Sequence, residues 1–277
     1  MSTLLTGGII QNNRFLGIAN PYISTVEVAD AMNDKITYLQ NLRTIVDKNL
    51  RTNLLLWIDS TGGFNKRVVG ADTFIPKAYE NFSSAQFVNS TQAIQPKLLS
   101  LGIDFSTGGL RHAFASDSPL NIFAASGSKI LSFGFWFKRT SIGTESIVFG
   151  EEYSLTWRGF GVKFNSSNRL VFTTFGVKGY IFTPTFTSTT VWNHVCFVYD
   201  NSFDVKLYVN GSYHSTITHT VVGIASTMLS YIISSNSLWD GNTNYSRTYL
   251  NDIRLYNSNL TATQISDWYN STSSKYA

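Results

Sequence analysis

The segment Leu131-Ser-Phe-Gly-Phe-Trp-Phe-Lys138 decides the fold of this chain. Its phenylalanines stand at every second position, and side chains along a β-strand alternate between the two faces of a sheet. The predicted strand therefore has one aromatic face. The segment Trp192-Asn-His-Val-Cys-Phe-Val-Tyr-Asp200 alternates in the same way, with Val195, Phe197 and Tyr199 on one face. Two such faces packed together predict the core of a β-sandwich about 10 Å thick.

Outward from these segments, the sequence predicts many short strands. Each is rich in β-branched or aromatic residues and is bounded by Gly, Asn, Ser or Asp. Asn210-Gly211 predicts a tight hairpin turn, and Thr261 is the expected N-cap of a short helix over about 262–270. Close spacing without interleaved helices favours an antiparallel sandwich. The predicted strands are Leu54–Asp59, Leu98–Phe105, Ile130–Lys138, Glu145–Phe149, Gly159–Phe164, Arg169–Phe175, Gly179–Thr183, Trp192–Asp200, Asp204–Val209, Met228–Ser234 and Thr248–Tyr256.

The chain before residue 54 has the pattern of an arm followed by one long amphipathic helix. Ser24 and Glu27 form a capping-box sequence, and the apolar residues that follow recur at steps of three and four. We therefore predict an α-helix over about 25–50 within an N-terminal unit, 1–53, and a sandwich over 54–277. Either the chain's own sandwich or a partner is expected to cover the apolar stripe. The stripe consists of Val28, Met32, Ile36, Leu39, Leu42, Val46 and Leu50.

Composition limits the classes of function. The chain has 21 Lys and Arg against 17 Asp and Glu in 277 residues, a net charge of +4, and its basic residues do not cluster. We therefore expect no nucleic-acid partner. No apolar run approaches the roughly 20 residues of a membrane-spanning helix, and the start lacks a signal-peptide pattern. The single cysteine, Cys196, excludes an intramolecular disulfide and a multi-cysteine metal site.

The two quoted segments resemble the "FTISFWVK" and "W-x-H-V-A-x-V-x-D" strands of the laminin-G-like family. Three further motifs stand in the order of that family: Leu101-Gly-Ile-Asp-Phe105, Val205-Lys-Leu-Tyr-Val-Asn-Gly211 and Asp252-Ile-Arg-Leu-Tyr-Asn257. Over about residues 98–269, the chain thus resembles laminin-G-like, concanavalin A-like lectins. The resemblance implies an antiparallel jelly-roll β-sandwich, which the N-terminal arm and one long α-helix precede here.

Catalytic residues are not evident in the sequence. A glycosidase needs two carboxylates at a defined separation, and the chain lacks the E-x-D-x-x-E run of the related glucanases. Glu151 and Glu152 are adjacent, so their side chains would point to opposite faces of a strand. His194 and Cys196 share one face, a spacing compatible with a thiol–imidazole pair, but the resemblance makes His194 a structural position. We therefore expect no enzymatic activity.

The segment 235–246 is the best candidate for a binding site. Sugar sites pair an aromatic platform with hydrogen-bonding groups, and this segment contains both; Trp157 would flank it or form a separate patch. Alternatively, Trp239 anchors the segment in the core. We expect no cofactor, although calcium is the common ligand of the family, with Asp59, Asp117, Asp240 and Asp252 as its candidate ligands here. The candidate carbohydrate-binding residues are Trp239, Asp240, Asn242, Asn244, Tyr245 and Trp157.

An N-terminal attachment element followed by a lectin-like head resembles the arrangement of phage capsid decoration proteins, head fibres and tail adhesins. The resemblance implies a non-enzymatic virion protein that is assembled in the host cytoplasm. Residues 1–53 would bind other virion proteins or a second copy, and residues 54–277 would face surface glycans. The alternative is a free-standing carbohydrate-binding or adhesion module whose helix packs on its own sandwich. A glycosidase on the same fold is the third hypothesis.

Overall fold

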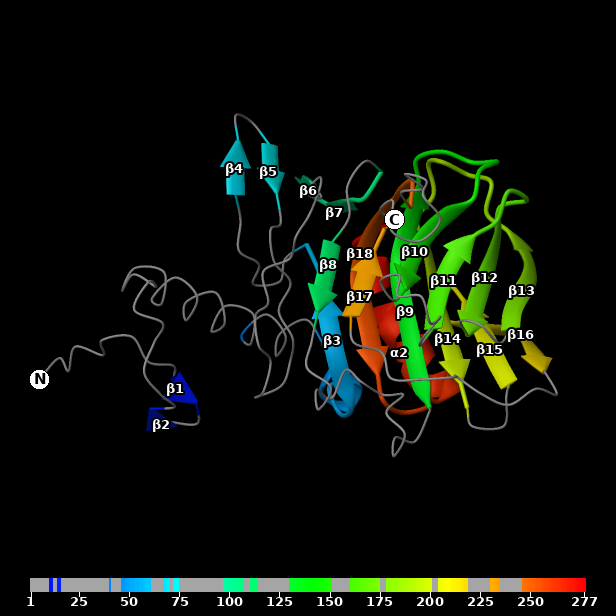
Figure 1. Cartoon of the computed structure of the whole chain (residues 1–277). Coiled ribbons are helices and arrows are strands. Elements are labelled where there is room, and N and C mark those ends of the chain that lie inside the picture. Colours follow the sequence, from blue (N-terminus) through cyan, green and yellow to red (C-terminus); the bar gives the residue numbers. More distant parts are fainter. Residues whose placement is uncertain are drawn as a thin grey trace, which may run out of the picture.

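The computed structural model of the chain contains two antiparallel sheets and a C-terminal α-helix (Figure 1). The predicted antiparallel β-sandwich is therefore confirmed. The larger sheet carries the C-terminal helix on one face and the smaller sheet on the other. The structure describes residues 10–11, 14–15, 40, 46–60, 67–69, 72–74, 97–106, 110–113, 130–150, 160–174, 178–200, 204–218, 230–234 and 246–277.

The larger sheet has the strand order β16-β15-β14-β9-β18-β7-β6-β5-β4. Strand β18 pairs with β7 along its first part and with β3 along its last part. The two central strands, β9 and β18, are the longest. The strands of this sheet are β3 (Leu54–Ile58), β4 (Arg67–Val69), β5 (Asp72–Phe74), β6 (Lys97–Leu99), β7 (Gly102–Asp104), β9 (Leu131–Arg139), β14 (Asn193–Tyr199), β15 (Asp204–Val209), β16 (Ser212–Thr218) and β18 (Thr248–Tyr256).

The smaller sheet has the order β13-β12-β11-β10-β17-β8. Its strands are β8 (Leu110–Ala113), β10 (Ser146–Gly150), β11 (Phe160–Phe164), β12 (Arg169–Thr174), β13 (Lys178–Thr185) and β17 (Ser230–Ile233). The other described elements are the hairpin β1 (Ile10–Gln11) and β2 (Arg14–Phe15), the 3₁₀-helix η1 (Lys48–Leu50) and the α-helix α2 (Ala262–Ser273).

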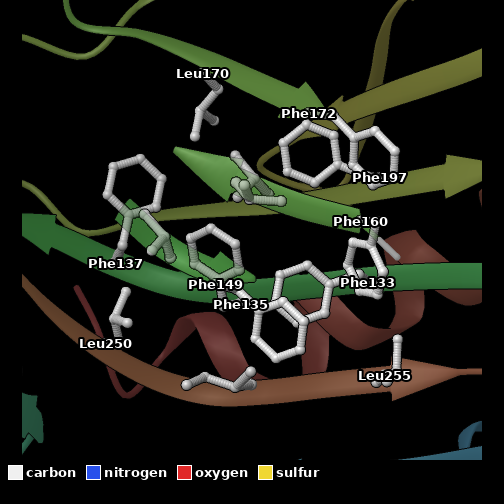
Figure 2. Packing of buried hydrophobic residues seen from close by; sticks show 14 of the residues in the cluster. Phe133, Phe135, Phe137, Phe149, Phe160, Leu170, Phe172, Phe197, Leu250 and Leu255 are labelled. Carbon is white, nitrogen blue, oxygen red and sulfur yellow. The ribbon is translucent and has the colours of Figure 1, made fainter. Parts of the chain in front are cut away.

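The core between the sheets follows from the alternation in the sequence. Phe133, Phe135 and Phe137 of β9 point toward the smaller sheet and are fully buried (Figure 2). Phe149 and Phe160 meet them from β10 and β11, with the ring centres of Phe133 and Phe149 4.4 Å apart. Tilted and edge-on contacts between aromatic rings add to the free energy of burial.

The opposite face of β9 is also buried, because helix α2 covers it. Thr261 caps α2, its side chain accepting a hydrogen bond from the Gln264 amide in a complete capping box. Trp268 packs onto Gly134, where a β-carbon would lie 2.8 Å from the indole ring. The predicted C-terminal helix is confirmed and runs three residues further than expected. The cluster under α2 contains Val46, Leu50, Leu54, Trp57, Cys196, Val198, Tyr208, Tyr256, Leu260, Ile265 and Trp268.

The predicted single strand Leu98–Phe105 is wrong. The structure divides it into β6 and β7, which pair with each other around a turn at Ser100 and Leu101. Gly102 has a φ of +131°, a conformation that glycine adopts readily, and the Trp192 ring lies where its β-carbon would be. The sequence did not indicate this turn, because the alternation of apolar and polar residues continues through it.

The predicted helix over 25–50 extends too far. Gln40 is helical, but Asp47 has an extended backbone with ψ 145°, and its side chain accepts a hydrogen bond from the Asn49 amide. Such a local bond competes with the helix. Val46 and Leu50 are 1% exposed and lie in the cluster under α2, so the chain's own sandwich covers this end of the stripe. The other stripe residues, Val28, Met32, Ile36, Leu39 and Leu42, lie outside the described residues, and the division of the chain at residue 53 stays a prediction.

Candidate functional site

The strand directions give the sandwich two distinct ends. We call one of them the Arg139 end; it contains Arg139, Ser146, Ser234 and Ser246. Strands β9, β11, β13, β15 and β17 run toward it, and their antiparallel partners run away from it. Phe137, Leu170 and Leu250 are the core residues on this side in Figure 2. The turns at 140–145, 165–168 and 186–192 all lie at the Arg139 end.

Five predicted sugar-binding residues, Trp239, Asp240, Asn242, Asn244 and Tyr245, lie outside the described residues. The structure does describe the two points where their segment is attached, and both are at the Arg139 end. The Ser246 amide donates to Ser234 Oγ at 2.8 Å, so the ends of the segment 235–245 lie side by side. Ser234 and Arg247 have φ values of 64° and 50°, which L residues rarely adopt. Such backbone strain persists where the surroundings impose it, and it clusters at functional sites.

Trp157 also lies outside the described residues. Its segment joins β10 to β11, and the adjoining residues Gly150 and Phe160 are at the end opposite Ser234 and Ser246. The two segments are therefore attached at opposite ends of the sandwich. This arrangement favours a separate patch for Trp157 over a position beside Trp239, and its role stays a prediction.

The described turns at the Arg139 end carry mainly neutral polar groups. The Gly143 amide donates to Asn168 Oδ1, which connects the turn 140–145 to the turn 165–168. Hydroxyl and amide side chains predominate in both turns and again at 187–190. Ile142 and Val191 are exposed among them, at 42% and 54%. Neutral donors and acceptors beside exposed apolar groups suit a ligand with hydroxyl groups and C–H faces.

Beneath these turns, a layer of buried polar side chains closes the core. Ser234 and Ser246 both donate from Oγ to the Phe105 carbonyl oxygen, at 3.0 and 3.2 Å. Thr248 Oγ1 in turn donates to Ser246 Oγ at 2.6 Å. These hydroxyl groups are fully buried and have partners, as buried polar groups require. The network joins β7, β17 and β18, and it fixes where the segment 235–245 begins and ends.

Arg139 and Ser146 belong to the same layer but lack partners. All three guanidinium nitrogens of Arg139 and the Ser146 hydroxyl are buried without a hydrogen bond. The Arg139 guanidinium lies over the Phe164 ring, 4.0 Å from its centre. We did not identify Arg139 from the sequence, although a signal was present. It stands two residues after Phe137, at the next inward-facing position of the same strand.

Asp252, one of the candidate calcium ligands, has a structural role. Its carboxylate accepts hydrogen bonds from Trp57 Nε1, Trp268 Nε1 and two nitrogens of Arg254, at 2.6–2.8 Å. The Arg254 ion pair and these hydrogen bonds hold the pKa of Asp252 below its usual value, although burial alone would raise it. With four donors already bound, this carboxylate is not available to calcium. The Asp252 carboxylate, paired with Arg254, therefore attaches α2 to the larger sheet through Trp268.

His194 and Cys196 lie on the same face of β14, as predicted, and α2 buries both. The His194 ring lies among Trp136, Trp268 and Tyr269. Burial lowers the pKa of His194 to about 3 and raises the pKa of the Cys196 thiol well above its ordinary value. A neutral imidazole and a protonated, inaccessible thiol do not form a nucleophilic pair at neutral pH. Their positions agree with a structural role.

The described acidic and metal-ligating side chains lie apart from one another or are paired. In this part of the chain, no group of three His, Cys, Asp or Glu side chains is placed to hold a metal ion. Asp59 is buried, and Asp117 and Asp240 lie outside the described residues. Glu145 forms an ion pair with Lys163 on the outer face of the smaller sheet. The described helices include none that is both long and apolar enough to cross a membrane.

Comparison with known proteins identifies the family. A laminin G model described as "Concanavalin A-like lectin/glucanases superfamily" matches residues 114–266, more than half of the chain. The chain therefore belongs to this superfamily, as the resemblance of its motifs implied. The comparison with curated proteins finds no match.

Solved structures share the fold. The Trypanosoma rangeli sialidase in complex with sialic acid has a TM-score of 0.59 at 13% identity, over 91% of this chain and 40% of the sialidase chain. The binding domain of botulinum neurotoxin DC in complex with SialylT has a TM-score of 0.50 at 14% identity, over 79% of this chain and 52% of that chain. This chain thus spans about half or less of each neighbour.

Proposed function

We propose that this chain is a non-enzymatic glycan-binding protein and that its sugar site is at the Arg139 end. One observation carries the proposal: β17 and β18 attach both ends of the segment 235–245 at this end, beside turns with neutral polar side chains. The segment supplies two aromatic residues with Asp and Asn side chains. Membership of a lectin superfamily, and the sugars in the complexes of two structural neighbours, support a glycan as the ligand.

The non-enzymatic part of the proposal rests on the described titratable groups. Glu145 and Asp252 are each in an ion pair, and α2 buries His194 and Cys196. Glycoside hydrolysis requires a pair of carboxylates that can act as acid and as base or nucleophile. The described carboxylates that are paired with Lys163 and Arg254 are not free for these roles.

Alanine substitution of Trp239 and of Tyr245 tests the glycan site. We expect each variant to lose at least about ten-fold of the wild-type signal on a glycan array, because stacking on an aromatic ring is removed. Tyr213→Ala is the matched control: Tyr213 is 56% exposed on the edge strand β16, and its strand partner Tyr208 belongs to the cluster under α2. Unchanged binding by both site variants would refute the assignment, and loss in Tyr213→Ala alone would move the site to β16.

We further propose that the N-terminal part of the chain attaches this head to a virion assembled in the host cytoplasm. Support for this comes from the sequence pattern of residues 1–53 and from the resemblance to phage decoration, fibre and adhesin proteins. Val46 and Leu50 pack on the chain's own sandwich, so we assign attachment to residues 1–45. A variant without residues 1–45 should remain folded and fail to join particles. Normal incorporation of this variant would leave the free-standing module as the better description.

A further inference from the structure

Two of the arginines that the structure describes are fully buried, and they differ in one respect. Arg254 is 0% exposed, and its guanidinium binds both oxygens of Asp252. Arg139 is 1% exposed, and none of its guanidinium nitrogens has a hydrogen-bond partner. It takes part in none of the ion pairs among the described residues. The fold therefore balances one buried positive charge and leaves the other without an anion.

A buried guanidinium without an acceptor costs free energy, because it has lost water and gained nothing equivalent. The group keeps its charge at neutral pH: burial and then the neighbouring Arg247 lower the pKa of Arg139 only to about 10. The contact with Phe164 offsets part of the cost through a cation–π interaction. It does not satisfy the N–H donors, because all three guanidinium nitrogens are still without a hydrogen-bond partner.

Ser146 places a second free donor at the same ring. Its Cα is the strand partner of Phe164, over whose ring the Arg139 guanidinium lies, and its hydroxyl is also buried without a partner. The other hydroxyl groups of the layer, on Ser234, Ser246 and Thr248, donate to one another and to the Phe105 carbonyl oxygen. Phe164 is thus the common neighbour of both free donors of this layer, and the positive charge of Arg247 acts on Arg139.

We propose that Arg139 and Ser146 bind a carboxylate, and that the glycan recognised at the Arg139 end is therefore an acidic one. This inference rests on the proposed function and names the class of its ligand. The planar fork of a guanidinium matches the two oxygens of a carboxylate, and the centre of the Phe164 ring lies 4.0 Å from the centre of that fork. The proposal requires a carboxylate to reach these buried donors between the sheets, with the sugar ring among the neutral turns.

The first test compares an acidic sugar with its uncharged derivative. Isothermal titration calorimetry would measure binding of the methyl glycoside of N-acetylneuraminic acid and of its carboxyl methyl ester. The wild-type chain should bind the acid at least ten-fold more tightly than the ester. Arg139→Gln should bind both with the affinity of the ester. Equal binding of acid and ester by the wild-type chain, or a preference retained in Arg139→Gln, would overturn the inference.

Two variants control for charge and folding. Arg169→Gln removes an exposed arginine from the same end and should keep the wild-type preference for the acid. Arg139→Met retains an apolar contact with Phe164 and removes an unpaired buried charge, so it should fold at least as stably as the wild-type chain. Loss of the preference in a folded Arg139→Met then reports lost carboxylate binding, whereas loss in Arg169→Gln would assign the effect to general surface charge.

Acetate separates failure of this inference from failure of the proposed function. At constant ionic strength, acetate should raise the melting temperature of the wild-type chain and leave that of Arg139→Met unchanged. If the array shows neutral glycans bound and neither acetate nor the acidic sugar is preferred, the proposed function stands and this inference falls. If acetate stabilises the chain but no sugar binds, the site takes free carboxylates, and the acidic-glycan inference falls together with the proposed function.

Discussion

Asp252 illustrates how one residue joins separate parts of the fold. It has a φ of 45° within a β-bulge of β18, where the pairing with β9 shifts between Asn251 and Arg254. The bulge turns its carboxylate toward α2, where it meets Arg254 and the indole nitrogens of Trp57 and Trp268. A carboxylate with four donors in a buried site is costly to replace, because any change leaves Arg254 unpaired.

Gly134 is the residue at which a small substitution should have a large effect. In Gly134→Ala, the new β-carbon would lie 2.6 Å from the Val195 carbonyl oxygen and 2.8 Å from Trp268, so the helix must shift. We expect the free energy of unfolding to fall by roughly 1–3 kcal/mol, as for other overpacked cores. Urea unfolding measures it. Gly179→Ala, whose β-carbon would meet Val171 only at 3.7 Å, should be close to neutral, and equal losses in both would contradict this explanation.

His194 should make the stability of the sandwich depend on pH. Its pKa in the folded chain, about 3, lies below the usual 6.5, chiefly because of burial and despite the charge of Asp252. Below pH 6.5 the unfolded chain takes up a proton that the folded chain excludes. The free energy of unfolding should therefore fall between about pH 6.5 and 3, by up to about 1.4 kcal/mol per pH unit. In His194→Phe this dependence should weaken, as followed by urea unfolding at several pH values. His214→Ala is the control: it removes an exposed histidine, and the pH dependence of stability should persist in it.

At the scale of elements, α2 is the part of the fold that makes the larger sheet a buried layer on both faces. The sheet's outer side contains Trp136, His194 and Cys196, all buried. The Trp136 indole donates to Thr272 Oγ1 of the helix at 2.9 Å, and the Tyr276 ring stacks on Trp136 with centres 4.2 Å apart. Undocking of the helix would expose this whole surface.

Cys196 can report on how firmly α2 is docked. Burial under the helix should make the thiol unreactive toward a thiol reagent in the native chain. Thr261→Ala removes the N-cap and should cost about 1 kcal/mol of helix stability. A loss of about 1 kcal/mol makes the undocked state of α2 about five-fold more populated. If undocking of α2 exposes Cys196, labelling of this thiol should therefore become about five-fold faster. Thr263→Ala changes an exposed threonine inside the same helix and should not speed labelling; a similar acceleration there would rule out the cap as the cause.

At the scale of the whole molecule, the sandwich assigns different tasks to its two ends. The Arg139 end gathers the polar layer, the neutral turns and both attachment points of the segment 235–245. The opposite end receives the chain from the N-terminal part: Leu54 of β3 pairs with Tyr256 there, and Thr261 begins α2 there. In Figure 1, α2 lies behind the larger sheet, away from the smaller one. A ligand at the Arg139 end would therefore be remote from the N-terminal connection.

Two N-terminal deletions should separate attachment from stability. Removing residues 1–45 leaves Val46 and Leu50 in the cluster under α2, so the melting temperature of the sandwich should change little. Removing residues 1–53 takes away both buried side chains and should lower the free energy of unfolding by roughly 3–6 kcal/mol, at about 1.5–3 kcal/mol for each. Thermal and urea unfolding of the two variants decide this. Equal stability would place the start of the head at residue 54, as the sequence pattern predicted.

Much of the architecture could be predicted because it depends on local alternation. The inward positions of β9 and β14, the Asn210-Gly211 hairpin and the Thr261 cap all follow from residues close together in the chain. The turn at Ser100 and Leu101 was not predicted, because the alternation of apolar residues continues through it; the close approach of Trp192 to Gly102, ninety positions away, is visible only in the tertiary structure. The predicted end of the N-terminal helix was wrong for a local reason: the Asn49 backbone N–H donates a hydrogen bond to the Asp47 carboxylate, and the apolar spacing does not indicate this bond.

The sequence by itself determined the fold class, the two aromatic faces and the segment with the candidate sugar-binding residues, because side-chain alternation and turn residues act over a few positions. Only the tertiary structure decided which end of the sandwich bears that segment and which buried charges are balanced. The first depends on β17 and β18, which lie far apart in the chain and meet through Ser234 and Ser246. The second depends on burial: the fold buries both arginines, but Arg254 has Asp252 two residues before it, whereas Arg139 has the ring of Phe164 beside it.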